Sequence, residues 1–363
     1  MTISHILFFC LIAILISWLI PSKWKLTTLL ITSIISIYWL QPASTIRHID
    51  FWLPSTALIL SAFTWFVVQK DSHPSLSQFG KTAGFIILTV VSLSLLRYIE
   101  PLCCLTASKP PQISSVIIFL LVSCLLIYLI YRQTHQKTLL SKVMIFVLFS
   151  LLIILKSPTL AEKSSALLRS IIGQDISLAS SVDITWLGFS YLCFRLVHVL
   201  LDSNSGRLGE ISLANFLNYA LFFPSYTAGP IDRVGRFNSD LRMIENLPEE
   251  KSLIQRFTRL IQSTNFISGA QRILIGIFKK FVLADGLALI ALNDQNATQI
   301  QSGFWGVVLI YAFSLRIYLD FSGYTDIAIG IGNLLGIELP ENFDKPYQRS
   351  EEHTSELQSR QSI

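Results

Sequence analysis

The stretch RIYLDFSGYTDIAIGIGNLLG, from Arg316 to Gly336, combines a membrane-like apolar composition with internal charges. Arg316 and Asp320 are four residues apart, so they can pair on one helix. Gly323 permits a bend, and Asp326 begins the next segment. Small residues recur every fourth position at Ala328, Gly332 and Gly336, a spacing that lets membrane helices approach closely. The glycines lack the strand–turn–helix context of a dinucleotide site. The stretch therefore predicts two membrane helices meeting near Gly323.

The composition of the whole chain agrees with a membrane protein. The 363 residues are 52% hydrophobic and 14% charged, whereas soluble domains carry roughly 25% charged residues. The mean hydropathy is +0.57. The net charge of +5 is spread over many short loops rather than clustered, which argues against a nucleic-acid partner.

Six apolar runs in the first half are candidate membrane spans. They are Ile3–Ile20, Leu26–Leu40, Phe51–Val68, Ala83–Tyr98, Ile113–Tyr131 and Leu139–Leu155. The first run has no basic leader and no small-residue cleavage site, so it is interpreted as a helix rather than a signal peptide. Lys and Arg are shared almost equally between alternate loops of this half, so the sequence does not fix the orientation.

The second half contains five further spans, several with internal ionisable residues. They are Trp186–Leu201, Leu213–Ala228, Phe266–Leu292, Ser302–Leu319 and Phe321–Leu339. Lys279-Lys280 interrupts the third, which predicts two shorter segments there. The charged stretch Asp232 to Ser263 is too polar to span and predicts helices at the membrane surface. The predicted fold is an all-α, polytopic integral membrane helical bundle with about ten or eleven membrane segments.

Three regions are expected along the chain. Residues 1–182 form N-terminal transmembrane helices, and residues 183–348 form an incomplete core. From Arg349 the chain reads RSEEHTSELQSRQSI, without apolar periodicity. Back-translation of Arg349 to Ser359 gives a common short-read library adapter. Residues 349–363 are therefore interpreted as a non-native tail, and the true sequence after Gln348 as unknown.

Arg195, His198 and Asp202 form the clearest polar constellation, because their spacing of three and seven residues places them on one helical face. Charge inside a bilayer is costly unless it is paired or faces a polar cavity. Two readings stay open: a stripe that lines a substrate path, or a structural tie to a neighbouring helix. His198 as a catalytic base is the less favoured alternative.

The stretch LFFPSYTAGPIDR, Leu221 to Arg233, carries helix breakers directly before Asp232-Arg233. A broken helix is tolerated in a membrane where it is buried or lines a cavity. The five cysteines lack metal-ligand or disulfide spacing, and no metal site is predicted. A nucleophile elbow, a zinc-protease motif and a P-loop are also missing from the sequence.

Four segments resemble the membrane-bound O-acyltransferase family, near its alginate O-acetyltransferase and teichoic-acid D-alanyl-transfer branches. They are WLGFSYLCFRLVHVLLD from Trp186, FFPSYTAGPIDR from Phe222, IGIFKKFVLAD from Ile275, and YLDFSGYTDIAIGIGNLLGIELPENFDKPY from Tyr318 to Tyr347. The resemblance covers roughly Trp186 to Tyr347. It implies a ring-like bundle with a tunnel, a multi-pass protein of the bacterial plasma membrane, and contact with membrane lipid.

The resemblance also implies the chemistry. An acyl group would pass from a cytoplasmic thioester donor, acyl-CoA or an acyl carrier protein, to a hydroxyl of an extracytoplasmic glycan or cell-envelope polymer, with no bound cofactor. A hydroxyl needs a positioned base, and histidine suits that role. The family's histidines lie beyond the segment that matches Pro340–Tyr347. No catalytic residue is therefore expected before Gln348, and these 363 residues are expected to be inactive.

The resemblance assigns a tunnel-shaping or bracing role to residues in its two most specific motifs, namely Pro230, Arg233, Asp320, Tyr324 and Asp326. Two other functions remain open. A transporter or flippase for a lipid-linked saccharide also fits the many helices, the charges and the broken segments, although its usual internal symmetry is not evident. A non-catalytic membrane scaffold is the third interpretation.

Overall fold

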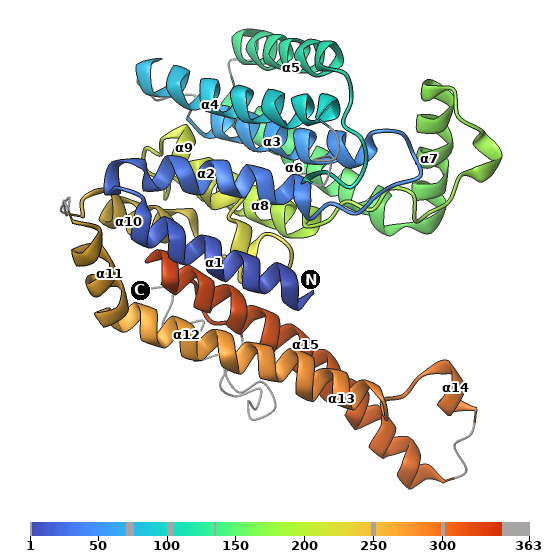
Figure 1. Cartoon of the computed structure of the whole chain (residues 1–363). Helices are drawn as coiled ribbons and strands as arrows, with labels where there is room; N and C mark the ends of the chain where they lie inside the picture. The colour runs from blue at the N-terminus through green and yellow to red at the C-terminus, as the bar shows by residue number, and fades with distance from the viewer. Residues whose placement is uncertain are drawn as a thin grey trace.

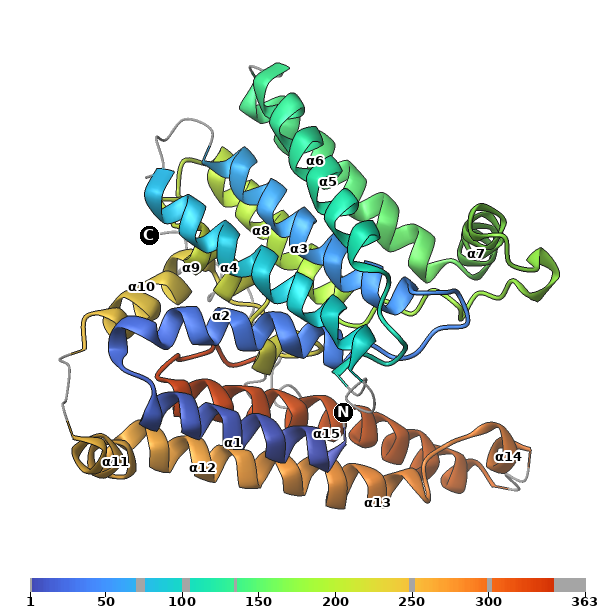
Figure 2. The same cartoon turned by 45° about the horizontal axis from the view of Figure 1, so that its top comes forward.

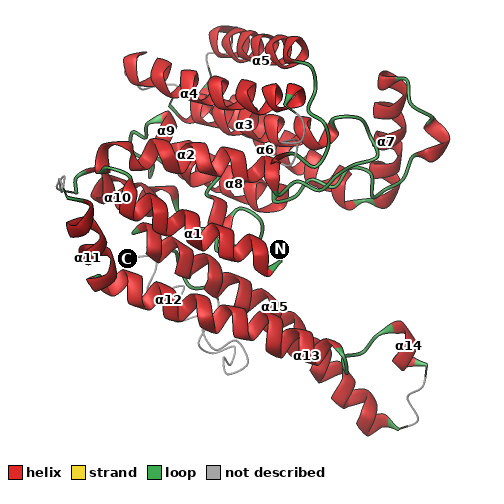
Figure 3. Cartoon of the chain, in the orientation of Figure 1, coloured by secondary structure: helices red, strands yellow, loops and turns green. Residues whose placement is uncertain are grey.

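The computed structural model describes residues 2–69, 76–99, 105–133, 136–247, 252–298 and 302–342. Within these ranges every regular element is a helix (Figure 3), which confirms the all-α prediction. The expected non-native tail, residues 349–363, lies outside the described residues, as does the end of the motif from Phe343 onward.

The helices of the first half agree with the predicted spans to within a few residues at most ends. They are α1 (Ile3–Leu19), α2 (Ser22–Trp39), α3 (Ile49–Val68), α4 (Leu76–Leu95), α5 (Ile113–Gln133), α6 (Lys137–Lys156) and α7 (Pro158–Ile172), with 3₁₀ turns η1 (Leu96–Tyr98) and η3 (Ile176–Leu178). The sequence analysis did not predict α7. It is short and amphipathic, and it begins with proline at its first position, where a backbone donor is not needed.

The second half departs more from prediction. It contains α8 (Phe189–Asn204), α9 (Leu213–Ala220), the 3₁₀ turn η4 (Phe223–Ser225), α10 (Val234–Glu245), α11 (Leu253–Gln262), α12 (Thr264–Ile277), the π-helix η5 (Phe278–Ala284), α13 (Asp285–Ala288), α14 (Asp294–Ala297) and α15 (Gly303–Leu335). The helices α10 and α11 occupy the charged stretch, as predicted.

Four predicted spans in this half differ from the structure in their ends or their continuity. The spans at 302–319 and 321–339 form one continuous helix, α15, and Gly323 lies inside it without ending it. The span at 266–292 is likewise unbroken, because the chain passes Lys279-Lys280 in a π-helix rather than a loop. The span at 213–228 stops being helical after Ala220.

The bundle is a membrane protein by the length and composition of its helices. Ile49–Val68, Phe79–Tyr98, Lys137–Lys156 and Gly303–Leu335 are each long and apolar enough to cross a bilayer, and α1 and Ile113–Ile127 are shorter apolar helices. Large apolar side chains such as Leu121 and Phe146 are more than three-fifths exposed on the outer helices. Such a surface suits lipid rather than water.

Most of the longer helices run alongside one another, whereas α7 and α11 run across them (Figures 1 and 2). In both views α1, α12 and α15 lie side by side on one side, α3 to α6 on the other, and α2 and α8 between them. The end of the bundle where α1 passes into α2 is here called the Pro21 face. It also holds α11, since Arg256 on α11 donates to the carbonyl of Leu19 (3.2 Å).

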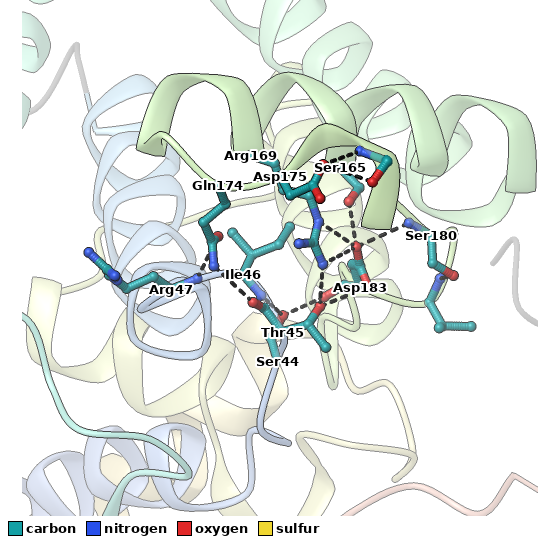
Figure 4. A network of polar contacts seen from close by, with 12 residues as sticks. Ser44, Thr45, Ile46, Arg47, Ser165, Arg169, Gln174, Asp175, Ser180 and Asp183 are labelled. Carbon is teal, nitrogen blue, oxygen red and sulfur yellow. Dashed lines mark hydrogen bonds and ion pairs between the residues drawn. The ribbon is translucent and has the colours of Figure 1, made fainter.

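The opposite end is here called the His48 face. It carries the loop 40–48, where His48 Nδ1 lies 2.9 Å from the Lys109 carbonyl oxygen, and it carries α7. The loop between α7 and α8 is fastened there by a buried network (Figure 4). Asp183 accepts hydrogen bonds from Ser165 Oγ (2.6 Å), Thr45 Oγ1 (2.8 Å) and Arg169 Nε (3.1 Å). Burial acts to raise the pKa of Asp183, but these donors outweigh it and keep the pKa below its ordinary value.

The closest helix contact joins α12 to α15, and glycines make it possible. A Cβ atom added at Gly276 would lie 2.6 Å from the Gly323 carbonyl oxygen, and one at Gly330 would lie 2.7 Å from that of Gly269. Backbones this close leave no room for a side chain. The predicted Gly332 and Gly336 do not make this contact. Gly332 packs instead on the Ile337 carbonyl, and Gly336 ends α15 with φ of 80°.

We predict that Gly276→Ala destabilises the bundle by about 1–3 kcal/mol, because the added methyl group overpacks the α12–α15 contact. The matched control is Gly286→Ala, at a helical position where an added Cβ meets nothing within 4 Å. Thermal unfolding of the detergent-purified variants measures the difference. An equal midpoint for the two variants would show that the close glycine contact does not hold these helices together.

Candidate functional site

The segment Leu221 to Arg233 enters the bundle and returns to the face from which it came. It follows α9, which ends at Ala220, and it leads into α10. Pro224 and Pro230 cannot donate backbone hydrogen bonds, so a helix cannot continue through them. The segment reaches mid-depth, where the Phe223 ring lies 4.8 Å from that of Phe9 on α1. Residues 221–233 are called the re-entrant segment below, and its broken form agrees with the prediction.

Arg195 on α8 holds the start of this segment. Its side chain is only 1% exposed. The guanidinium donates to the carbonyl oxygens of Ala220 (3.1 Å) and Ser225 (2.5 Å) and to Ser225 Oγ (2.7 Å). Pro224 has no NH to donate to the Ala220 carbonyl four residues before it, and the Ser225 carbonyl also accepts the backbone NH of Gly229 at 3.3 Å. A buried carbonyl without a donor is costly in a membrane, so Arg195 stabilises the break directly.

His198 and Asp202 continue the same face of α8, but the structure does not bring them into this contact. Both are half-buried, and they lie one and two turns further toward the Pro21 face. The carbonyl of Asp202 accepts the backbone NH of Arg207 at 3.0 Å where the helix ends. Of the three predicted residues, Arg195 alone joins α8 to the re-entrant segment by a side-chain hydrogen bond within the described residues.

Tyr324 on α15 contacts the re-entrant segment from the other side. Its hydroxyl forms a short hydrogen bond with Thr227 Oγ1 and lies 3.5 Å from the carbonyl oxygen of Pro224. Pro230 is buried at the end of the segment, where Tyr219 donates to the Asp232 carbonyl (2.8 Å). The segment is thus fixed between α8 and α15.

Asp326, half a turn beyond Tyr324, forms an ion-paired cluster with the facing helix. Its carboxylate lies 2.6 Å from Lys279 Nζ and 2.8 Å from Arg272 Nε. Asp326 is 5% exposed, and the two nearby cations offset the cost of burying its charge. Arg272 also pairs with Glu341 just after α15. The cluster lies beside the close α12–α15 contact.

The predicted pair between Arg316 and Asp320 is wrong. Asp320 pairs with Lys280 on η5, and Arg316 is exposed. The π-helix explains the difference: its wider turn presents two consecutive lysines to one neighbouring helix, so Lys279 reaches Asp326 while Lys280 reaches Asp320. Sequence spacing alone favours the i,i+4 partner on the same helix.

Arg236, rather than the predicted Arg233, makes the ionic contacts at the end of the re-entrant segment. Arg233 is exposed, and its backbone NH donates to Asp232 Oδ1 (2.7 Å). The Arg236 guanidinium pairs with Asp232 and lies 3.6 Å from Asp240, and it also donates to the carbonyl of Glu338. This arginine lies one turn further along α10, so its i,i+4 spacing from Asp232 was the signal that could have identified it.

Sequence reasoning also missed Ser225, Thr227, Lys279 and Arg272, whose roles depend on contacts between distant segments. In the sequence, Lys279 stood out only because it interrupts the apolar run Phe266–Leu292. Chemically, the assembled groups form a rigid polar frame rather than a nucleophile paired with a base. Within the described part of the chain, no cluster of three or more His, Cys, Asp or Glu side chains could hold a metal ion.

A model of the membrane-bound O-acyltransferase family matches residues 14–358. The chain is similar to a teichoic acid D-alanyltransferase of Streptococcus thermophilus, with 35% identity over 170 residues, which is 45% of this chain and 38% of that protein. It is also similar to a peptidoglycan O-acetyltransferase of Helicobacter pylori, with 39% identity over 142 residues, 38% of this chain and 24% of that protein.

A third similar protein is a probable alginate O-acetylase of Pseudomonas aeruginosa, with 28% identity over 165 residues, 44% of this chain and 28% of that protein. The matched part therefore spans less than two-fifths of the length of each of these curated relatives.

We predict that Arg195→Met lowers the stability of the purified protein by about 2–4 kcal/mol, because it removes the guanidinium donor of the Ala220 carbonyl and Ser225 Oγ and leaves the Ser225 carbonyl with the Gly229 NH alone. Arg195→Lys is expected to recover only part of this loss, since an ammonium group lacks the fork that reaches both carbonyls.

The control is Arg207→Met, an exposed arginine just beyond α8, which is expected to change little. The thermal midpoint in detergent measures all three variants. If Arg195→Met unfolded at the wild-type temperature, the re-entrant segment would not depend on this side chain.

Proposed function

Because the chain belongs to the membrane-bound O-acyltransferase family, we propose that it is part of an enzyme that acylates a cell-envelope polymer. In this proposal an acyl group moves from a cytoplasmic thioester donor, acyl-CoA or an acyl carrier protein, to a hydroxyl of an extracytoplasmic glycan or related polymer. The protein would lie in the bacterial plasma membrane.

The observation that carries the proposal is the family match across residues 14–358. The similar proteins all bear names of transferases or acetylases that act on teichoic acid, peptidoglycan or alginate. The motifs at Trp186–Asp202, Phe222–Arg233 and Tyr318–Glu341 meet at one place, where Arg195 and Tyr324 hold the re-entrant segment. That convergence fits a shared reaction site better than unrelated structural needs.

The orientation of the protein follows from its basic residues. Lys and Arg are more frequent in the loops and helix ends toward the Pro21 face than in those toward the His48 face, which supports a cytoplasmic Pro21 face. Toward the Pro21 face lie Lys23, Lys25, Lys81, Lys137, Lys142, Arg207, Arg233, Arg236, Arg242, Arg256 and Arg259; toward the His48 face lie Arg47, Arg97, Lys109, Lys156, Lys163 and Arg169. The thioester donor would then approach from the Pro21 face.

The described residues would contribute structure rather than the base. A hydroxyl must lose its proton as it attacks the thioester, and a histidine is the usual acceptor. His5 forms a hydrogen bond with the Thr2 hydroxyl, and His48 forms one with the Lys109 carbonyl oxygen. We propose that Asp326, Tyr324 and Arg195 fix the walls around the reaction centre, and that the family histidines act from a part of the protein that follows Gln348.

We predict that a cysteine at position 205 is shielded from a membrane-impermeant maleimide in intact cells, whereas one at position 170 is labelled. Ser205 and Ser170 are both exposed, on the Pro21 and His48 faces respectively. Each is changed in a background without Cys10, Cys103, Cys104, Cys124 and Cys193. Lysed cells, in which both must react, supply the control. If only Ser205→Cys were labelled in intact cells, the Pro21 face would lie outside the cell and the proposed orientation would be wrong.

We also predict that expression of the complete gene product raises the amount of ester-linked acyl groups in the cell envelope, measured after release with mild alkali. Residues 1–348 alone are expected to give no increase. Both proteins are compared at equal amounts in the membrane. If the complete protein left ester content unchanged but moved a lipid-linked saccharide across vesicles, the transport function would replace the proposal.

A further inference from the structure

The helix α7 and the turn η3 expose a group of large apolar side chains at the His48 face. The group consists of Leu160, Leu167, Ile171, Ile176, Leu178 and Val182, which are between 38% and 73% exposed. These six residues are called the α7 patch below. Exposed apolar side chains gathered in this way are unfavourable in water, and they mark a surface that contacts lipid or another protein.

One side of α7 is fixed to the protein. Ala161, Ser165 and Arg169 recur every fourth residue along the helix, and all three are buried. Ser165 Oγ and Arg169 Nε donate to the Asp183 carboxylate at 2.6 and 3.1 Å (Figure 4). The helix is therefore held in place by this side, and its two remaining sides face the surroundings.

The two remaining sides of α7 differ in polarity. At 3.6 residues per turn, Leu160, Leu167 and Ile171 fall on one side of the helix. Glu162 and Ser170, which are exposed, fall on the other free side, about a third of the way round the helix. A helix that divides its free surface in this way is typical of the boundary between acyl chains and water.

The position of α7 along the bundle agrees with the depth of a bilayer surface. The helix α6 is long and apolar enough to cross a membrane, and its side chains Phe146 and Ile153 are 73% and 59% exposed. Only Ser157 separates α6 from α7, which then runs across the longer helices (Figures 1 and 2). A helix that turns aside where a span ends lies near the headgroups. Lys156 and Lys163 are exposed there, and lysine side chains extend their charged ends to that layer.

We propose that α7 lies in the surface of the bilayer on the His48 side, with the α7 patch among the acyl chains and the side of Glu162 and Ser170 toward water. The covering partner is lipid, because the patch begins at the end of a span whose outer surface already faces lipid. The Asp183 network then lies at headgroup depth, where it holds the helix against the bundle. The proposal is independent of the acyl transfer and of which face is cytoplasmic.

The test places a nitroxide spin label on single cysteines of the purified chain in phosphatidylcholine nanodiscs, in a background without the five cysteines of the sequence. Leu167→Cys and Ile171→Cys report on the patch, whereas Glu162→Cys and Ser170→Cys report on the polar side. Oxygen concentrates among acyl chains, and a water-soluble nickel chelate is excluded from them. We expect the ratio of collisions with oxygen to collisions with the chelate to be severalfold higher at the two patch positions.

Two further exposed positions supply the standards. Phe146→Cys on the outer side of α6 gives the ratio for lipid, and Ser205→Cys on the Pro21 face gives the ratio for water. All of the substituted side chains are exposed, so the changes leave the packed interior as it is. Thermal midpoints check that each labelled variant is folded.

Three outcomes would overturn the proposal. If the labels at 167 and 171 matched the water standard, the patch would lie outside the bilayer. If they collided with neither reagent, protein rather than lipid would cover the patch. If all four positions on α7 matched the lipid standard, the helix would be immersed in the acyl chains and not placed at the surface.

Discussion

An open helix end inside a membrane must find donors and acceptors within the protein, and Arg195 meets this constraint at the start of the re-entrant segment. The re-entrant segment breaks the backbone at the centre of the molecule, where water does not satisfy the exposed carbonyls. One guanidinium binds the carbonyls on both sides of the break. A lysine presents a single point of charge, so the planar donor set of arginine is what allows the chain to turn back there.

The contact between α12 and α15 determines where the other charges lie. Four glycines bring the two backbones together, and the contact at Gly323 extends from Gly276 on α12 to Lys280 inside the π-helix. Because the helices are so close, Lys279 and Arg272 reach Asp326 from the neighbouring helix. Close packing and charge pairing therefore support each other: the glycines set the distance, and the ion pairs compensate the acidic groups on α15.

The sequence was sufficient for the features that follow from local composition. Apolar runs such as Phe51–Val68 coincide closely with helices, since a membrane span needs a certain length of apolar chain. Pro224 and Pro230 identified the broken segment for a similarly local reason. The partners were harder to predict. Lys280, not Arg316, pairs with Asp320, because the partner is chosen by the approach of another helix.

Other features were beyond local rules for their own reasons. Gly323 suggested a bend, yet in α15 it serves as a site of backbone contact, and the sequence cannot distinguish these uses of glycine. The helix α7 is too short and too polar to be recognised as a membrane span from its sequence. The proposed orientation depends on the re-entrant segment, since a segment that returns to its own face changes which loops share a side.

The re-entrant segment also constrains the order in which the protein is made. Residues 221–233 do not form a complete span, so the insertion machinery cannot release them into lipid as an independent helix. When they emerge from the ribosome, α2 and α8 are already synthesised and present Ser33 and Arg195 as docking partners. Tyr324 arrives only with α15. Biogenesis therefore passes through a half-built state in which one wall of this segment is in place and the other has yet to be translated.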